Sequence, residues 1–427
     1  MNIKPTSFSC AALLACCSIL SLNARHVEAQ QDANVLTAAA SAPIANETLN
    51  RTNVVSVVVD ASSDIATKHT ENRTSAREAL EARGIVFGFS YKTELLGSLF
   101  HDRGAEHDVS LLGSGLSSLD VDLLKMNLYR GHISLSAQTL HGTGLNESLM
   151  GTVQLPSNLD ATKYTKLIEA WYGDSYLENH VNFKVGRLYA DGDFGVIENG
   201  GDFLNASYGV VPTSPMPTYP DPELGATVSG VPTERISVGA GVYRGGYLDA
   251  IHEGDPALRK GLFTLAEARL KPNAKGSSHD GAYRFGVWQQ AHGTWMRDAK
   301  YDEDPVRNYG IYAVVDYWFH THSEDDRGPG VFARWGWAPS DRNEISHYWG
   351  TGVNYLGLNP LRRQDAVGLG ISQITLPTSK RETVCELFYK LQISKMIVIQ
   401  PDLQWARNPS GTGANQAIAG LRLGLNF

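Results

Sequence analysis

The chain has few cysteines and no excess of basic charge, and both features limit the classes of protein to which it can belong. Only four cysteines occur in 427 residues. The 37 lysines and arginines are outnumbered by 45 aspartates and glutamates, which gives a formal net charge of -8. Because nucleic-acid-binding proteins need a basic face that neutralises phosphates, we expect no nucleic-acid partner.

Long apolar runs are also missing from most of the chain. Charged residues make up 19% of the sequence and the mean hydropathy is -0.23, which is too polar for a bundle of membrane-spanning helices. A transmembrane β-barrel remains compatible with this composition, because only half of its strand residues face lipid.

The one long apolar run lies beside the N-terminus, from Phe8 to Leu22. It follows Lys4 and precedes Val27-Glu28-Ala29, which has the small-residue spacing of a signal-peptidase site. The run is shorter than the roughly 20 apolar residues of a membrane anchor. Residues 1–29 are therefore predicted to be a secretory signal peptide, with lipoprotein cleavage at Cys16 as an alternative.

Removal of residues 1–29 would leave Cys385 as the single cysteine, so we expect no internal disulfide in the processed chain. Residues 30–73 are rich in alanine, serine, asparagine and threonine, and we expect them to form a flexible leader. Residues 74–84 combine a cap-like threonine, good helix formers and a final glycine, which predicts a short helix.

After residue 84 the hydrophobic pattern has a period of two, which is typical of strands with one apolar face. Alternation of this kind from residue 417 to Phe427 is the clearest example. The pattern indicates about sixteen strands of roughly ten residues, an even number within the range of bacterial barrels. The predicted strands begin near Val86, Leu119, His132, Lys166, Val181, Gly225, Arg235, Leu262, Ala282, Gly310, Val331, Ser346, Ala366, Thr383, Ile397 and Gln416.

Soluble β-sandwiches alternate in the same way, but a terminal strand ending in an aromatic residue, behind a signal peptide, favours an outer-membrane barrel. We therefore predict an all-β fold, a transmembrane antiparallel β-barrel over residues 85–427 with a short N-terminal helix. Aromatic residues near strand ends fit the interfacial girdles of such barrels. They are Trp335, Trp337, Tyr348, Trp349, Tyr355 and Trp405.

The longest connection runs from about Ala190 to Leu224, and a loop of this length is usually functional. In a pore we expect it to fold inward and narrow the lumen. Arg187, Asp191 and Asp193 adjoin this loop and are expected to anchor it near the constriction. Asp191-Gly192-Asp193 also begins like a calcium-binding loop, but Val196 stands where the turn glycine belongs, so we expect no metal. No cofactor is expected.

Seven stretches of the sequence resemble the carbohydrate-selective porins of the OprB type, in the same order along the chain. They are residues 82–91, 168–172, 185–194, 201–209, 330–334, 339–343 and 400–404. The resemblance covers residues 82–427. It implies a sixteen-stranded channel in the outer membrane of a Gram-negative bacterium, often trimeric, which passes monosaccharides such as glucose.

A sugar has many hydroxyl groups and an apolar ring face, so a selective pore should combine an aromatic surface with charged or amide groups. In the strand near Lys166 we expect Ile168, Ala170 and Tyr172 to face lipid, and Leu167, Glu169 and Trp171 to face the lumen. Glu169 and Trp171 are the predicted hydroxyl acceptor and stacking surface.

The same alternation places further polar side chains in the lumen. Charges on the lipid face cost about 2 to 4 kcal/mol near the midplane, so Arg334 and Arg422 are predicted to point inward. The alternative for most charged residues in the lumen is that they are simply solvated or form ion pairs with one another, without binding sugar. The remaining predicted pore-lining residues are Arg187, Asp191, Asp193, Glu386, Lys390, Gln400, Asp402 and Gln404.

Three other functions are compatible with a barrel. A general diffusion porin would have the same fold with a less selective pore. An outer-membrane barrel enzyme would need a nucleophile or carboxylate beside a histidine at a strand end. A structural or adhesive barrel would have a plugged lumen. We predict a passive monosaccharide channel, not an enzyme, whose partners are sugars and outer-membrane lipid.

Overall fold

The computed structural model describes residues 76–101, 109–144, 152–244, 261–272, 281–291, 307–319 and 327–427. The predicted signal peptide and leader lie outside these residues. The described chain contains one short helix, α3 (Ala76–Ala82), and two 3-10 turns, η2 (Ala206–Tyr208) and η4 (Pro409–Gly411). The strands are β1 (Ile85–His101), β2 (Val109–Asp122), β3 (His132–Gly142), β4 (Tyr164–Tyr176), β5 (Val181–Leu188), β6 (Glu223–Thr233), β7 (Ile236–Arg244), β8 (Leu262–Leu270), β9 (Ala282–Ala291), β10 (Asn308–Trp318), β11 (Gly328–Trp337), β12 (His347–Leu356), β13 (Ala366–Thr375), β14 (Arg381–Gln392), β15 (Ile397–Arg407) and β16 (Asn415–Asn426).

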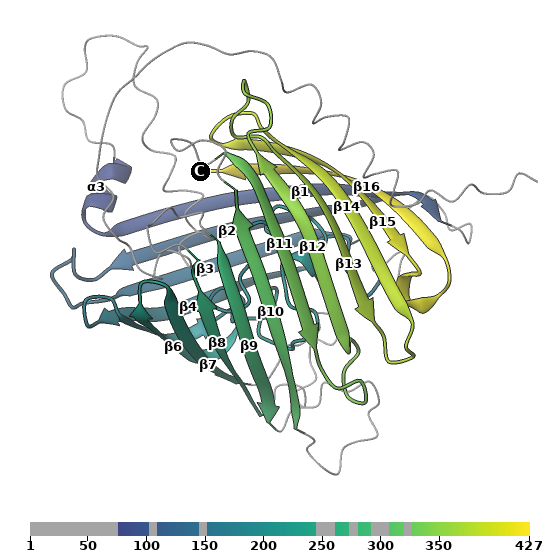
Figure 1. Ribbon diagram of the computed structural model, residues 1–427. Helices are drawn as coiled ribbons and strands as arrows, with labels where there is room; N and C mark the ends of the chain where they lie inside the picture. Colours follow the sequence, from purple (N-terminus) through teal and green to yellow (C-terminus); the bar gives the residue numbers. More distant parts are fainter. Residues whose placement is uncertain are drawn as a thin grey trace, which may run out of the picture. The chain divides into compact units, whose positions relative to one another are not determined.

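These sixteen strands form one closed antiparallel barrel, in which each strand pairs with its sequence neighbours and β1 pairs with β16 (Figure 1). Closure aligns Ser90 with Asn426 and Glu94 with Arg422. A closed barrel has no unpaired strand edge, as hydrocarbon surroundings require. The predicted fold class is thus confirmed, including the short helix before β1. No helix among the described residues is long and apolar enough to cross a membrane.

Strand β2 begins ten residues before its predicted start near Leu119. Its register with β1 runs from Val109, opposite Gly97, to Val121, opposite Ile85. The residues from Gly113 to Ser118 are mostly glycine and serine, so neither face of this strand shows the apolar alternation on which the prediction depended.

Cys385 lies in β14 and is buried. The other three cysteines stand at positions 10, 16 and 17, within the predicted signal peptide. These three cysteines lie outside the described residues, so the absence of an internal disulfide from the chain without residues 1–29 stays a prediction.

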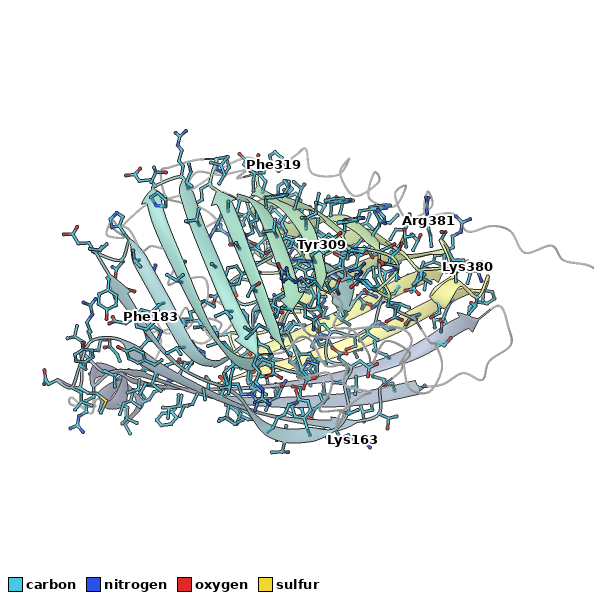
Figure 2. The ribbon with its side chains drawn as sticks, turned by 90° about the horizontal axis from the view of Figure 1, so that it is seen from below. Lys163, Phe183, Tyr309, Phe319, Lys380 and Arg381 are labelled. Carbon is cyan, nitrogen blue, oxygen red and sulfur yellow. The ribbon has the colours of Figure 1, made fainter. Side chains whose placement is uncertain are left out.

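The outer face of the barrel is apolar and aromatic. Tyr309 and Phe319 are exposed there, whereas Lys380 and Arg381 lie at the end of the barrel where β14 begins (Figure 2). Trp335 and Trp349 lie opposite each other on β11 and β12 and are both exposed. These features suit contact with lipid and its interface.

Tyr348, which was predicted to belong to the aromatic girdle, points into the barrel and not toward lipid. The side chain of Tyr348 is buried inside the barrel, where its hydroxyl donates a 2.6 Å hydrogen bond to the carbonyl of Ser207. The prediction that Tyr348 belongs to the aromatic girdle is therefore wrong. Since Tyr348 and Trp349 are consecutive strand residues, they must face opposite sides, and composition alone did not say which faced lipid.

A β-bulge changes the facing of β4 at Ile168. The register with β3 moves from Glu169 opposite Ser136 directly to Leu167 opposite Ala137. As a result Leu167 is 47% exposed and Ile168 is buried, so the predicted orientation of both residues was wrong. A bulge inserts one extra residue, which reverses the alternation on one side of it and leaves no trace in a two-residue pattern.

The four longest connections each join an odd-numbered strand to the next strand and lie at the same end of the barrel. They are residues 143–163, 189–222, 245–261 and 292–307. In outer-membrane barrels the longer loops are extracellular and the shorter turns periplasmic. This rule assigns the end at which β1 begins and β16 ends to the periplasm.

Inward-facing aromatic rings stand beside glycines on neighbouring strands. Phe332 lies opposite Gly352, and Phe388 lies opposite Gly368. A Cβ atom on Gly352 would lie 2.6 Å from the ring of Phe332, and one on Gly368 would overlap the ring of Phe388. Both rings are buried, so these glycines provide space that the packing inside the barrel requires.

We expect Gly368→Ala to lower the temperature at which the barrel unfolds, because the added methyl group displaces the ring of Phe388. Overpacking of this kind costs about 1 to 3 kcal/mol. The matched control is Gly424→Ala, where the nearest atom to an added Cβ lies 3.6 Å away. Heat-dependent migration of the folded barrel in detergent gels measures the difference, and equal unfolding temperatures for the two variants would contradict the prediction.

Candidate functional site

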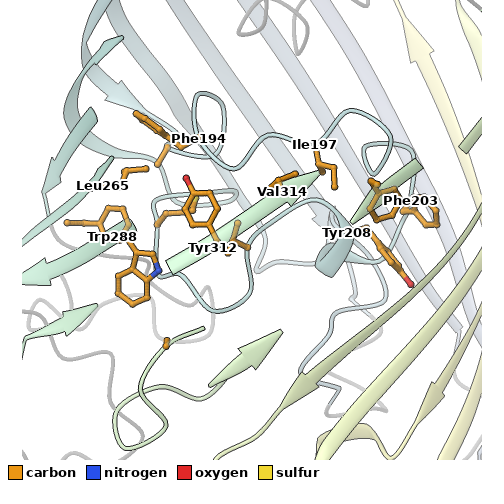
Figure 3. Close-up of a cluster of buried hydrophobic side chains, with 14 of the residues drawn as sticks. Phe194, Ile197, Phe203, Tyr208, Leu265, Trp288, Tyr312 and Val314 are labelled. Carbon is orange, nitrogen blue, oxygen red and sulfur yellow. The ribbon is translucent and has the colours of Figure 1, made fainter. Parts of the chain in front are cut away.

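The loop between β5 and β6, residues 189–222, folds into the barrel and forms a hydrophobic core with its wall. Phe194, Ile197, Phe203, Tyr208 and Met216 are all buried. Burial of such side chains contributes about 1.5 to 3 kcal/mol each, so it holds the loop against the wall. The strand residues that pack against the loop include Tyr243, Phe263, Leu265, Trp288, Tyr312, Val314, Phe332 and Phe388 (Figure 3).

Carboxylates on the wall accept hydrogen bonds from the backbone of this loop. Glu386, only 1% exposed, accepts from the amides of Leu204 at 2.6 Å and Asn205 at 3.0 Å. Glu267 accepts from the amide of Gly195 at 2.7 Å. A loop inside a barrel would otherwise bury backbone amides without partners, which costs about 1 to 3 kcal/mol for each group.

Basic and amide side chains of the wall bind the loop in the same manner. Arg334 donates to the carbonyls of Val210 and Gly195, the latter at 2.7 Å. Lys390 lies 2.6 Å from a carboxylate oxygen of Asp202, and Gln400 donates to the carbonyl of the same residue at 2.6 Å.

The ionisation of Asp202 reflects these contacts. Burial raises its pKa, but the Lys390 ammonium, the Asn354 amide and the charge of Lys92 lower it, so the pKa lies below its usual value. Asp202 is therefore a carboxylate at neutral pH, and its attraction to Lys390 contributes to holding the loop.

A second inward segment, residues 152–163 of the connection between β3 and β4, is anchored by the last strands. Gln404 donates to the carbonyl of Pro156 at 2.7 Å and to Asp402 at 3.0 Å. Arg422 pairs with Glu94 across the closing strands and donates to Asn158.

These contacts revise the predicted sugar ligands. Each of the predicted residues on β11 and β14 to β16 is buried or half-buried inside the barrel, as the alternation predicted. However, all of them except Asp402 form hydrogen bonds with the two inward segments, and none lines the cavity described below. They are Arg334, Glu386, Lys390, Gln400, Asp402, Gln404 and Arg422.

A space lined by polar residues lies between the beginning of the loop and the wall formed by β2 to β9. A cavity of about 1300 Å³, including its opening to solvent, occupies this space. Its polar lining combines carboxylates, hydroxyls and basic groups. The charged and aromatic residues that line it include Asp120, His132, Glu169, Trp171, Asp174, Phe183, Lys184, Asp193, Phe194, Glu267, Arg269 and Arg284.

Trp171 and Glu169 both line this cavity, beyond the bulge in β4. The indole of Trp171 contacts the His132 ring edge-on, with centroids 5.0 Å apart. The Lys184 ammonium lies 5.1 Å from the indole centroid and 2.5 Å from a carboxylate oxygen of Asp193. The site therefore presents an aromatic ring surrounded by charged groups.

The other three predicted residues near the start of the loop, Asp193, Asp191 and Arg187, have different surroundings. Asp193 lines the cavity and ties the loop to β5 through Lys184, as expected of an anchor. Asp191 accepts a hydrogen bond from Thr218 of the same loop. Arg187 is not part of the cavity lining, and its register partner Leu224 is 55% exposed on the outer side. The predicted pore-lining role of Arg187 was therefore not supported.

Sequence reasoning missed His132, Lys184, Arg269 and Arg284. Arg269 and Arg284 could have been predicted from the sequence. Each is a charged residue at an inward position of a strand, β8 or β9, in which inward and outward residues otherwise alternate regularly. The described part of the chain has no group of three or more histidine, cysteine, aspartate or glutamate side chains that could hold a metal ion.

A closed sixteen-stranded barrel with a long loop folded into its lumen defines the class of outer-membrane porins. The chain belongs to the carbohydrate-selective porin, OprB family, whose model matches residues 106–427. This membership implies a channel rather than an enzyme, and a location in the outer membrane.

The chain is similar to Porin B of Pseudomonas aeruginosa, with 22% identity over 211 residues, which is 39% of this chain and 46% of the relative. The match thus spans about half the length of that curated relative.

Two solved structures of Pseudomonas putida OprB have a similar fold. The high-pH structure shares 19% identity and has a TM-score of 0.72, with 82% of this chain and 96% of that chain covered. The low-pH structure shares 17% identity and has a TM-score of 0.52, with coverages of 82% and 95%.

We expect Glu386→Gln to loosen the inward loop, because an amide offers one oxygen where two backbone amides of the loop each need an acceptor. The loss of about 2 kcal/mol corresponds to a more than tenfold rise in the rate of proteolysis between residues 189 and 222. Glu178→Gln, an exposed carboxylate in the turn after β4, is the control. Equal cleavage rates in the two variants would show that Glu386 does not hold the loop.

Proposed function

We propose that this protein is a passive outer-membrane channel for monosaccharides, and that these pass through the cavity between the inward loop and strands β2 to β9. The observation that carries this proposal is the combination of Trp171, Glu169 and Asp120 on one side of a cavity inside the barrel. Membership of a carbohydrate-selective family supports the same substrate class.

The proposed binding mode follows from the chemistry of a hexose. The C–H groups of one ring face pack against the Trp171 indole, and hydroxyls donate to the carboxylates of Glu169 and Asp120. Affinity near 1 mM, about 4 kcal/mol, is enough for facilitated diffusion and still permits release. The anchored loop keeps the passage at a constant width.

The proposal extends to the rest of the chain. Residues 1–29 act as a signal peptide for export, residues 30–73 form a leader, and the apolar outer face of the barrel contacts membrane lipid. The homotrimer implied by the family resemblance stays a prediction.

Solute flux through the purified protein in liposomes tests the function directly. We expect glucose to enter faster than an amino acid and an organic anion of similar size, and much faster than a disaccharide. Equal rates for glucose, the amino acid and the anion would identify a general diffusion porin. Absence of flux for every solute would indicate a plugged barrel.

We expect Trp171→Ala to raise the glucose concentration that half-blocks the ion current by about tenfold, with little change in the current itself. The physical reason is loss of the ring surface, since an aromatic contact contributes about 0.5 to 1.5 kcal/mol and a tenfold change corresponds to about 1.4 kcal/mol. Trp335→Ala removes an indole from the outer face and is the matched control. If glucose blocks the current of Trp171→Ala as strongly as that of the parent protein, Trp171 is not part of the sugar-binding site.

One contact favours a general diffusion porin as the second candidate. The Lys184 ammonium already lies over the Trp171 ring, 5.1 Å from its centroid, so a sugar must use the other face or displace Lys184. The liposome comparison separates the two candidates, because only a selective channel favours glucose over other solutes of its size.

A further inference from the structure

Two arginines lie side by side in the cavity wall, away from Trp171. Arg269 on β8 and Arg284 on β9 occupy directly opposite positions in the register. Their exposures are 7% and 6%, and both line the cavity. Ser237 on β7 is the register partner of Arg269 on its other side and also lines the cavity.

Like charges at directly opposite strand positions repel, so this arrangement is unfavourable unless negative charge lies close by. Glu267 is one such charge, with an oxygen 3.2 Å from Arg284. The other oxygen of Glu267 accepts from Gly195 and from the Tyr312 hydroxyl at 2.8 Å. Glu267 therefore contacts both the inward loop and Arg284.

The two walls of the cavity differ in charge. The β2 and β4 wall carries the carboxylates of Asp120, Glu169 and Asp174, whereas the β8 and β9 wall carries the two guanidinium groups and one carboxylate, that of Glu267. In the closed barrel of sixteen strands, β2 and β9 are seven strands apart and so lie nearly opposite each other, whereas β4 and β8 are four strands apart along the curved wall. A solute in the cavity is thus between hydrogen-bond acceptors on one side and donors on the other.

We propose that Arg269 and Arg284 bind the carboxylate of an acidic monosaccharide, a hexuronate, during its passage. This inference rests on the proposed channel function and adds a substrate class to it. Guanidinium groups match a carboxylate in geometry and form charge-assisted hydrogen bonds with it. The hydroxyls of the same sugar donate to Asp120 and Glu169 opposite. A sugar phosphate, with nearly two negative charges, is repelled more strongly by that acidic wall.

The test is block of the ion current through the full-length protein in planar bilayers by glucose, glucuronate and glucose 6-phosphate. Glucose and glucuronate share the pyranose ring and differ in the carboxylate. We expect glucuronate to half-block the current at about one tenth of the glucose concentration, the effect of one charge-assisted contact. This advantage should shrink as the KCl concentration rises, because salt screens the interaction.

Arg269 is the residue to change, since Arg284 also supports Glu267. We expect Arg269→Gln to remove most of the advantage of glucuronate over glucose, measured as the ratio of the two half-blocking concentrations in the same variant. Arg269→Lys keeps the charge but not the planar fork, so it should retain only part of the advantage. Arg381→Gln, at an exposed position outside the cavity, controls for the loss of one positive charge.

The outcomes distinguish this inference from the channel function on which it rests. Equal or weaker block by glucuronate than by glucose would overturn the inference and leave the monosaccharide channel standing. Block by glucose 6-phosphate as strong as by glucuronate would overturn the restriction to carboxylates. Absence of block by all three sugars would overturn the proposed sugar channel itself. Loss of the glucuronate advantage in Arg381→Gln as well as in Arg269→Gln would reject a specific site.

Discussion

The structure depends on hydrogen bonds between the inner wall of the barrel and the backbone of the loop that enters it. A loop brings amides and carbonyls into a space from which much of the water is displaced, and each group needs a partner there. The wall provides them as single side chains, of which Glu386 and Arg334 are clear examples. A carboxylate suits paired amides, and a guanidinium suits paired carbonyls.

The distribution of these anchors determines where the pore lies. They are concentrated on β8 and on β10 to β16, together with an aromatic core that includes Tyr312 and Phe388. The loop therefore fills that half of the lumen. The cavity remains beside β2 to β9, where Trp171 and Lys184 face open space. Most wall residues that hold the loop are therefore distinct from those that line the cavity, although Glu267 and Lys184 do both.

Alternation along the strands predicted which residues point inward with good success. Glu169, Trp171 and Arg334 all face the interior, because a charge or a polar ring edge in hydrocarbon is costly. It failed where the backbone departs from period two, at the bulge of Ile168, and where both faces carry small residues, in β2. Neither departure changes the composition of the strand, so neither could be seen in the pattern.

The sequence alone determined the all-β barrel, the number of strands, the existence of a long loop and the family, because these follow from local periodicity and from motifs in a fixed order. The tertiary structure decided which lumenal residues bind the loop and which line the pore. Glu386 and Glu169 are both inward-facing carboxylates, yet the first accepts hydrogen bonds from the loop and the second lines the cavity. That distinction depends on where a loop of 34 residues packs between distant strands, a long-range contact that no local pattern encodes.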